Sequence, residues 1–401
     1  MSINRIAENL FNIQGPTGSF CQGDEKSFFE ALIKTDENEG LAIIKDLINK
    51  KAIDLNNLNP SEGLPLILAA SHHHFQICSF LLTVGFSPLE KDAMGRTLLF
   101  YIKPKQHFDQ DRLQLVCKEI EAASHLSPQE LWSMQDADNR TPLHLMAGLL
   151  TEEWLPFLKE RKVDLNAIDR HGQTPLYSAL SSCEDVKLLI QNGAKYDCVD
   201  VYGRTPLGTA IYKGAMSPNP VYYYNSAKIL IEAGAVPDER CLNEAYEWGK
   251  GIPRDLAVSL LEKGHFTKKS VSKIGVAVQL GLPDQLKKLL QQGENPNWSN
   301  PKMTERLSLL EKVDMNGDIL SFFFLLDFGI VIPDDFEGFG PLRRGLVKIY
   351  RNQYHSPEDR HEAIRKYLID SKEKFAQQFA WNRDFEALSK ELGCFSQKVI
   401  D

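Results

Sequence analysis

Three short stretches decide the fold of this chain: Asn139-Arg-Thr-Pro-Leu-His144, Gly172-Gln-Thr-Pro-Leu-Tyr177 and Gly203-Arg-Thr-Pro-Leu-Gly208. Their threonines lie 33 and then 31 residues apart, so one unit recurs at a nearly constant interval. A period of roughly 20 to 50 residues is typical of solenoids and other repeat arrays. We therefore expect helix pairs stacked into an elongated array.

The residue types of the motif predict a tight turn followed by a helix. Gly172, Gly203 and Asn139 precede the threonine by two positions, where a positive φ is cheap for glycine and tolerable for asparagine. Threonine can cap the helix, and proline fits its first position because the missing N–H has no partner there. About twenty residues later a second apolar helix ends at Gly193 or Gly234, which suits a left-handed cap.

These residues resemble the ankyrin consensus D-x-x-G-x-T-P-L-H-x-A…L-L-x-x-G-A. The match covers 136–167, 169–197 and 200–235, and the third copy carries an insertion of about eight residues within 216–225. The resemblance implies an all-α ankyrin-repeat solenoid. It also implies that His144 is a buried scaffold residue that hydrogen-bonds to turn groups.

Weaker copies extend the array on both sides. Upstream copies begin at Gly63 and Gly95, and downstream segments ending at Gly264, Gly293 and Gly329 keep only the end of the second helix. We count about eight or nine repeats with degenerate terminal repeats, 28–56 being the first.

The sequence predicts three regions: an N-terminal arm (1–24), the array (25–333) and a C-terminal helical region (334–401). In the last, one helical face is apolar, and we expect it to dock on the last repeat as a cap. That face carries Ile364, Tyr367, Leu368, Phe375 and Phe379.

Bulk properties narrow the function. The chain has 401 residues, a net charge of −8 and 43% hydrophobic residues, which disfavours disorder and a nucleic-acid footprint. Its seven cysteines are scattered and form no CxxC pair, as expected for free thiols in a reducing compartment. No stretch reaches the roughly 18 apolar residues of a membrane span, and no signal peptide is evident. We expect a cytoplasmic protein.

Candidate chemical motifs favour structural interpretations. Three adjacent histidines, His72 to His74, cannot converge on one metal ion from a helix and fit an inter-helix turn. Residues 14–21 weakly resemble the nucleophile segment of papain-like thiol proteases, and Cys21 would be the nucleophile. Residues 314–318 resemble the start of a calcium-binding loop. The loop signature needs a glutamate near its twelfth position, but here that position is Leu325. We expect no metal and no cofactor.

The resemblance also implies where a partner protein would bind. In ankyrin arrays the turns project as fingers, and their exposed positions together with the first helices line a concave face. Tyrosine and arginine are enriched in binding hot spots, and three tyrosines in the insertion would place aromatic surface on a loop. The alternative is that these tyrosines pack onto the second helix of their own repeat. The candidate residues are Met94, Arg96, Asp138, Arg140, Arg170, His171, Gln173, Tyr202, Arg204, Tyr212, Lys213, Tyr222, Tyr223 and Tyr224.

Three functional hypotheses remain. The first is a non-enzymatic scaffold that binds another protein. The second makes that scaffold an effector that an intracellular bacterium injects by type IV secretion to act on a host protein, with 395–401 as the translocation signal. The alternative is an effector enzyme, such as a thiol hydrolase or transferase, with its active site in the flanks 1–24 and 334–401.

Overall fold

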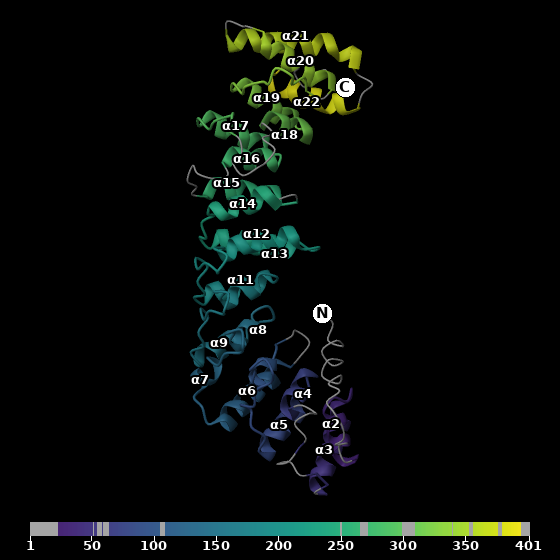
Figure 1. Cartoon of the computed structure of the whole chain (residues 1–401), viewed down its shortest axis with the longest axis vertical. Coiled ribbons are helices and arrows are strands. Elements are labelled where there is room, and N and C mark those ends of the chain that lie inside the picture. The colour runs from purple at the N-terminus through teal and green to yellow at the C-terminus, as the bar shows by residue number, and fades with distance from the viewer. Residues whose placement is uncertain are drawn as a thin grey trace. The chain divides into compact units, whose positions relative to one another are not determined.

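The computed structural model describes residues 23–50, 52–53, 58, 64–104, 109–248, 251–264, 272–298, 309–338, 340–352, 356–375 and 379–393. Every regular element in these ranges is helical (Figure 1), which confirms the predicted all-α class. The chain divides into two compact units, Met1–Tyr202 and Gly203–Asp401. No helix in the described ranges is long and apolar enough to cross a membrane.

Unit 1 is a succession of helix pairs. Its elements are α2 (Gly23–Leu32), α3 (Glu37–Asn49), α4 (Pro65–Ser71), α5 (Phe75–Val84), the 3-10 helix η2 (Leu98–Tyr101), α6 (Gln110–Ser124), α7 (Pro128–Trp132), α8 (Pro142–Met146), α9 (Trp154–Glu160), α10 (Pro175–Ala179) and α11 (Cys183–Gln191). The first helices α2, α4, η2, α8 and α10 contact one another in sequence. The second helices α3, α5 and α6 do the same.

The helix boundaries follow from the motif. Pro142, Pro175 and Pro206 each occupy the first turn of their helix, after an extended threonine. Gly193 and Gly234 have φ of 97° and 105°, so both adopt the predicted left-handed conformation. The sequence pattern therefore predicted the start and the end of these pairs.

Aromatic and ionic contacts join α6, α7 and α9 in unit 1. Trp132 is buried, and its indole N–H donates to Glu121 Oε1 over 3.2 Å. The same carboxylate accepts a hydrogen bond from Arg161 Nε over 2.5 Å. Arg161 also lies 3.4 Å from the centre of the Phe157 ring. A buried charge is tolerated here because it is both paired and hydrogen-bonded.

Unit 2 repeats the same arrangement with longer helices. Its elements are α12 (Pro206–Met216), α13 (Val221–Glu232), α14 (Glu239–Trp248), α15 (Arg254–Lys263), α16 (Lys273–Gln279), α17 (Pro283–Gln291), α18 (Leu309–Asn316), α19 (Ile319–Asp327), α20 (Gly340–Arg351), α21 (Pro357–Phe375) and α22 (Phe379–Glu391). One row of contacts runs through α12, α14, α16 and α18. Among the second helices, α13 contacts α15 and α17 contacts α19, while ion pairs Arg254–Asp284 and Lys288–Glu262 link α15 to α17. Stacking thus continues where the Thr-Pro motif has faded.

Two glycines let helices of unit 2 approach aromatic rings closely. A Cβ on Gly214 would lie 2.5 Å from the Tyr224 ring, and one on Gly275 would lie 2.3 Å from the Trp298 ring. Real Cβ atoms essentially never come this close to another heavy atom. These rings therefore pack against helix backbone, and only glycine fits beneath them.

The C-terminal region packs on the last helix pair mainly through α20 and α22, which contact α19, while α21 packs on α20 and α22. Ile364 and Leu368 of α21 are buried as predicted, whereas the side chains of Phe375 and Phe379 lie outside the described residues. A buried arginine, Arg343 of α20, pairs with Asp384 over 3.0 Å. The N-terminal arm up to residue 22 also lies outside the described ranges, so the three-region division stays a prediction.

Candidate functional site

Each projecting turn of unit 1 is built around an aspartate. We call four turns the fingers: residues 92–96, 136–140, 169–173 and 199–202. In the first, Asp92 Oδ1 accepts hydrogen bonds from the amides of Met94 and Arg96, both over 2.8 Å. Asp136 and Asp169 repeat this pattern over 2.8 to 3.0 Å. In these three fingers the consensus aspartate therefore closes the turn by taking up two backbone donors, which would otherwise lack partners.

In the first three fingers, the residue before the last position has a left-handed backbone. Gly95, Asn139 and Gly172 have φ of 72°, 58° and 71°. This confirms that the motif places glycine or asparagine where a positive φ is required. The tight turn then directs the side chains on either side of it outward.

Backbone hydrogen bonds link each finger to the next. The amide of one finger donates to a carbonyl of the preceding one, and the three N···O distances are 2.7, 2.9 and 2.9 Å. The pairs are Ala137 with Met94, Arg170 with Asp138, and Val201 with His171. This ladder holds the four fingers in register, and we call the resulting surface the finger ridge.

Two arginines predicted to contact a partner, Arg96 and Arg140, also stabilise the fingers. Arg140 donates to Asp136 Oδ2 from Nη2 over 2.8 Å, and Arg96 Nε donates to the same oxygen over 3.2 Å. Desolvation alone would raise the pKa of Asp136, but hydrogen bonds from Arg140, from the backbone amides of Arg140 and Asp138 and from Arg96 hold the pKa below its usual value. The two guanidinium groups are thus partly engaged within the ridge.

Asp138 and Gln173 also bridge neighbouring fingers. Asp138 Oδ1 forms an ion pair with Arg170 Nη1 at 2.7 Å, and Gln173 Nε2 donates a hydrogen bond to Asp200 Oδ2 over 2.9 Å. Arg170 remains more than half exposed despite its pair. Of these residues, Arg170 therefore keeps the most surface for another molecule.

Exposed aromatic and apolar side chains gather at the last two fingers. The rings of His171 and Tyr202 stack with centroids 6.4 Å apart, and Tyr202 is 55% exposed. Ile168, Val199 and Val201 are also exposed, and sequence reasoning missed all three. The missed signal is an apolar residue directly beside the motif aspartate. Met94, in the first finger, is exposed as predicted.

His144 supports the ridge from beneath, as the consensus implied. It is buried, its Nδ1 accepts from the Thr141 amide over 3.0 Å, and its Nε2 donates to the Gln173 carbonyl over 3.1 Å. Burial disfavours the imidazolium and lowers the pKa of His144. Tyr177 takes the same place one repeat later and donates to the Cys198 carbonyl over 2.8 Å.

The remaining predicted residues lie in unit 2 and require a correction. The insertion was expected to form a loop bearing three tyrosines, but Tyr222, Tyr223 and Tyr224 lie on α13, and only 217–220 separate it from α12. Tyr224 is buried against Gly214, so it is unavailable to a partner, whereas Tyr222 is exposed and Tyr223 is half-buried. The extra residues were absorbed because each added helical turn satisfies its own backbone groups.

Arg204 and Tyr212 of unit 2 also have internal contacts. Arg204 Nε lies 2.9 Å from Glu244 Oε1, and its guanidinium lies 4.1 Å from the centre of the Tyr212 ring. Both side chains are only partly exposed, as is Lys213. Arg204 therefore braces α12 against α14 and is a poor choice for a binding test.

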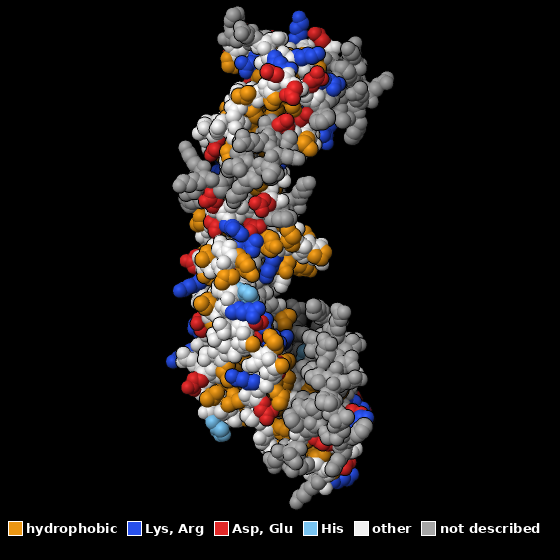
Figure 2. Space-filling view, viewed as in Figure 1, with side chains coloured by type: hydrophobic (Ala, Val, Ile, Leu, Met, Phe, Trp, Pro, Cys, Tyr) orange, Lys and Arg blue, Asp and Glu red, His pale blue; other side chains and the backbone are white. Residues whose placement is uncertain are grey.

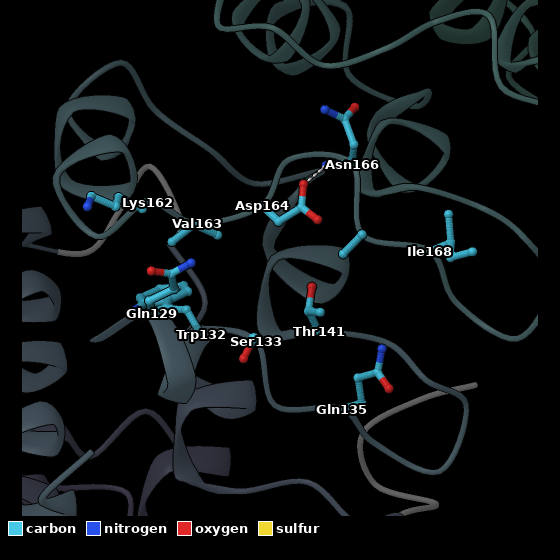
Figure 3. A pocket seen from close by; sticks show the side chains of 11 residues that line it. Gln129, Trp132, Ser133, Gln135, Thr141, Lys162, Val163, Asp164, Asn166 and Ile168 are labelled. Atoms are coloured by element: carbon cyan, nitrogen blue, oxygen red, sulfur yellow. Dashed lines mark hydrogen bonds between the residues drawn. The ribbon is translucent and has the colours of Figure 1, made fainter. Parts of the chain in front are cut away.

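Two hollows of about 510 Å³ each flank Lys162 and Val163 in unit 1. Figure 3 shows Gln129 and Trp132 on one side of the first, with Asp164 bound to the Asn166 amide across from them. The polar groups of its wall already serve the scaffold, since Thr141 and Asp164 are both hydrogen-bonded. No histidine or cysteine is among the residues that line either hollow.

Histidine and cysteine side chains, the usual metal ligands and nucleophiles, occur in the described ranges. There, no group of three or more His, Cys, Asp or Glu side chains could hold a metal ion. His72 to His74 form the predicted turn between α4 and α5, and His74 Nδ1 lies 2.9 Å from the Leu32 carbonyl oxygen. Burial raises the pKa of the Cys78, Cys117 and Cys241 thiols, which makes them poor nucleophiles. Cys21 lies outside the described residues.

Sequence comparisons identify the repeats. A family model for ankyrin repeats, in three copies, matches residues 113–200. Neurogenic locus notch homolog protein 1 of Cricetulus griseus is 27% identical over 206 residues, which cover 49% of this chain and 8% of the relative. Neurogenic locus notch homolog protein 2 of Homo sapiens is 28% identical over 196 residues, 48% of this chain and 7% of the relative. The match thus spans less than a tenth of these relatives.

Solved structures give weaker matches. The ankyrin repeat domain of Bcl-3, described as a unique member of the IkappaB protein family, has a TM-score of 0.38 and 23% identity over 54% of this chain and 89% of that chain. A chain from the complex of a predatory endopeptidase of Bdellovibrio bacteriovorus with an immunity protein also has a TM-score of 0.38 and 23% identity, covering 49% of this chain and 96% of that chain.

Proposed function

We propose that this chain, which contains ankyrin repeats, is a non-enzymatic scaffold that binds another protein through the finger ridge of unit 1. The observation that carries this proposal is the ladder of backbone hydrogen bonds between fingers, above which exposed apolar side chains are held in register. A rigid surface binds with less loss of conformational entropy than a mobile one. The ridge is therefore suited to recognition of a second protein.

The chemistry of the ridge indicates where binding energy would concentrate. Tyr202 stacks on His171 and stays exposed, so its ring can bury further area with few rotamers to lose. Val199 and Val201 flank it with apolar surface, and Arg170 supplies a cation close by in the chain. The matching partner surface is apolar at its centre and carries a carboxylate at its edge.

An affinity capture tests this proposal. The wild-type chain is compared with an Arg170→Ala, His171→Ala, Tyr202→Ala variant and with Leu115→Ala, a control on the exposed surface of α6. Loss of a bound protein from the triple variant alone supports the ridge. Equal recovery from all three chains contradicts it. Arg204 is left intact because its removal would disturb the contact between α12 and α14.

The finer hypothesis, an effector delivered to the host cytosol by type IV secretion, rests on the long α12–α13 insertion and on the helical region that follows the array. A translocation reporter fused to the chain tests it, with and without the last twenty or so residues. Delivery that survives the deletion contradicts a C-terminal signal.

The enzymatic alternative places a thiol nucleophile at Cys21. Labelling with an iodoacetamide probe at neutral pH tests it, because only a thiol with a lowered pKa reacts fast there. Fast labelling that disappears in Cys21→Ser would favour the enzyme over the scaffold.

A further inference from the structure

Lys162, in the turn after α9, has a backbone conformation that is costly for a residue with a side chain. Its φ is 53°, in the left-handed region. The turns after α5, α11 and α13 place glycine in that region, at Gly85, Gly193 and Gly234. The other non-glycine residues with a positive φ in the described ranges are histidine or asparagine, which tolerate it better than lysine does. A lysine retained where glycine would be less strained points to a use for its side chain.

Closing α9 does not require the Lys162 side chain. The Lys162 amide donates to the Lys159 carbonyl, and the Gly193 amide donates to the Ile190 carbonyl at the end of α11, both over 3.0 Å. A cation is favourable near a helix C-terminus, but Lys159 already occupies the last turn of α9. The turn therefore needs only the backbone of residue 162.

Lys162 lines a hollow between the ends of α9 and α11, which we call the α9–α11 hollow. Its volume is about 510 Å³, within the range of roughly 300 to 1,000 Å³ that is typical of small-molecule sites. Leu158 in its wall is buried, and Leu155 and Leu165 are half-buried. The hollow therefore offers an apolar lining of a size that suits a small molecule.

The charged residues that line this hollow are both positive. They are Lys159 and Lys162, and no described aspartate or glutamate lines it. Both lysines are exposed, and neither has an ion-pair partner among the described residues. Glu160 pairs with Arg161 over 3.1 Å. Figure 2 shows Lys and Arg side chains on the surface in the region of α9 and α11, and Figure 3 shows the Lys162 side chain directed away from Asp164, which lines the other hollow.

The helix ends beside the hollow indicate which anion it would accept. Both α9 and α11 end there, and a helix C-terminus carries a partial negative charge. A phosphate dianion is bound best at a helix N-terminus, where backbone N–H groups point at it. The α9–α11 hollow offers the opposite helix ends, so it favours a single negative charge. The leucines favour an apolar group attached to that charge.

We propose that the α9–α11 hollow binds a small aliphatic carboxylate. The carboxylate lies between the two lysines, and the aliphatic chain covers the three leucines. The chain contributes binding energy as it leaves water, and the ammonium groups select the charged end. This site does not depend on the finger ridge, and either proposal can fail without the other.

Isothermal titration calorimetry of the full chain with sodium octanoate tests the proposal. We expect saturable binding with a Kd of about 1 mM or below. Octan-1-ol, which has the chain without the charge, and acetate, which has the charge without the chain, should each bind at least about tenfold more weakly. Octyl phosphate, a dianion at about pH 8, should also bind more weakly than octanoate.

Matched variants locate the site. Lys159→Gln and Lys162→Gln remove one charge each and should each weaken octanoate binding about threefold or more. Lys162→Gly should weaken binding equally while it raises the Tm, because glycine relieves the positive φ. A purely structural lysine would not separate binding from stability in this way. Lys187→Gln, at an exposed position of α11 outside the lining, should leave the Kd unchanged.

Five results overturn the proposal. Octanoate may fail to saturate the chain up to about 10 mM, or bind no more tightly than octan-1-ol or octyl phosphate. The Kd may be unchanged in both Lys162 variants, or rise as much in the Lys187→Gln control. Finally, binding of N-acetyl-leucyl-leucine about tenfold tighter than octanoate would assign the hollow to the C-terminus of a polypeptide in place of a small molecule.

Discussion

The fingers of unit 1 and the helix pairs α16–α17 and α18–α19 of unit 2 stack similarly but are held by different chemistry. In unit 1, an aspartate closes each turn and backbone hydrogen bonds join one turn to the next. In unit 2, the loop after α17 contributes Trp298, whose ring packs on the α16 backbone at Gly275 and lies edge-on to Tyr246. Hydrogen bonds to an aspartate hold the turns of unit 1, whereas packing of an aromatic ring on helix backbone holds these helix pairs of unit 2.

One device is common to both regions. Asn166 Oδ1 accepts from the Lys195 amide over 2.7 Å in unit 1, and Asn297 Oδ1 accepts from the Val331 amide over 2.6 Å in unit 2. Each asparagine thus links the loop after one second helix to the loop after the next. Stacked helix pairs and these loop links therefore maintain the repeat, while the Thr-Pro motif is one of several ways to build the turn.

The largest expected effect is on Asp136. Asp136→Ala would leave two backbone amides and two arginine side chains without their acceptor, which should lower the free energy of unfolding by about 3 kcal/mol. Urea denaturation followed by circular dichroism measures it. Asp136→Asn, which keeps an acceptor oxygen, should lose less. If the two variants are equally stable, the hydrogen bonds that Asp136 accepts do not hold unit 1 together.

Gly275→Ala tests the aromatic side of the comparison. Alanine normally stabilises a helix relative to glycine by up to about 1 kcal/mol, but here the new Cβ would overlap the Trp298 ring. We expect a net loss of about 1 to 3 kcal/mol, typical of overpacking. Gly208→Ala is the matched control, because its Cβ would lie 3.6 Å from the nearest atoms. A stability gain in both variants would show that Trp298 moves aside freely.

His144 should make the stability of unit 1 depend on pH. Its folded pKa is lowered, so below about pH 6.5 the unfolded chain takes up a proton that the folded chain refuses. The free energy of unfolding should therefore be steady above that pH and fall below it, by at most about 1.4 kcal/mol per pH unit, until the folded pKa is reached. Denaturation at several pH values measures the slope.

The control for this prediction is His144→Asn, in which the slope should be smaller. Asp185 contributes an opposite slope, because burial raises its pKa to about 6, but it is present in both proteins and cancels in the difference. Identical pH profiles for the two chains would contradict a neutral, buried His144.

The smallest expected effect is on Tyr202. Tyr202→Ser should change the free energy of unfolding by less than about 0.5 kcal/mol, because the exposed ring contributes little to the ladder that holds the fingers. Thermal denaturation measures this, and partner binding should weaken in the same variant. A large loss of stability would mean that the His171–Tyr202 stack is structural.

Local backbone conformation could be predicted from the sequence where a residue type has a single physical role. Asn139 and Gly172 were predicted to take positive φ, and both do. The exposure of the predicted partner residues was harder to predict, because it depends on neighbours from other repeats. Arg96 was assigned to the surface, yet it is tied to Asp136, 40 residues away in sequence. Val199 is exposed and was overlooked, although it lies directly beside the motif aspartate Asp200.

The helix-pair unit, its period and its turns follow from local sequence, because caps, left-handed glycines and proline act within a few residues of chain. Only the tertiary structure decided that the insertion lengthens α12 and α13, that Tyr224 is buried while Tyr222 is exposed, and that arginines brace the fingers. Those outcomes depend on contacts between segments distant in sequence, where close packing and paired charges select among side chains that look equivalent in the sequence.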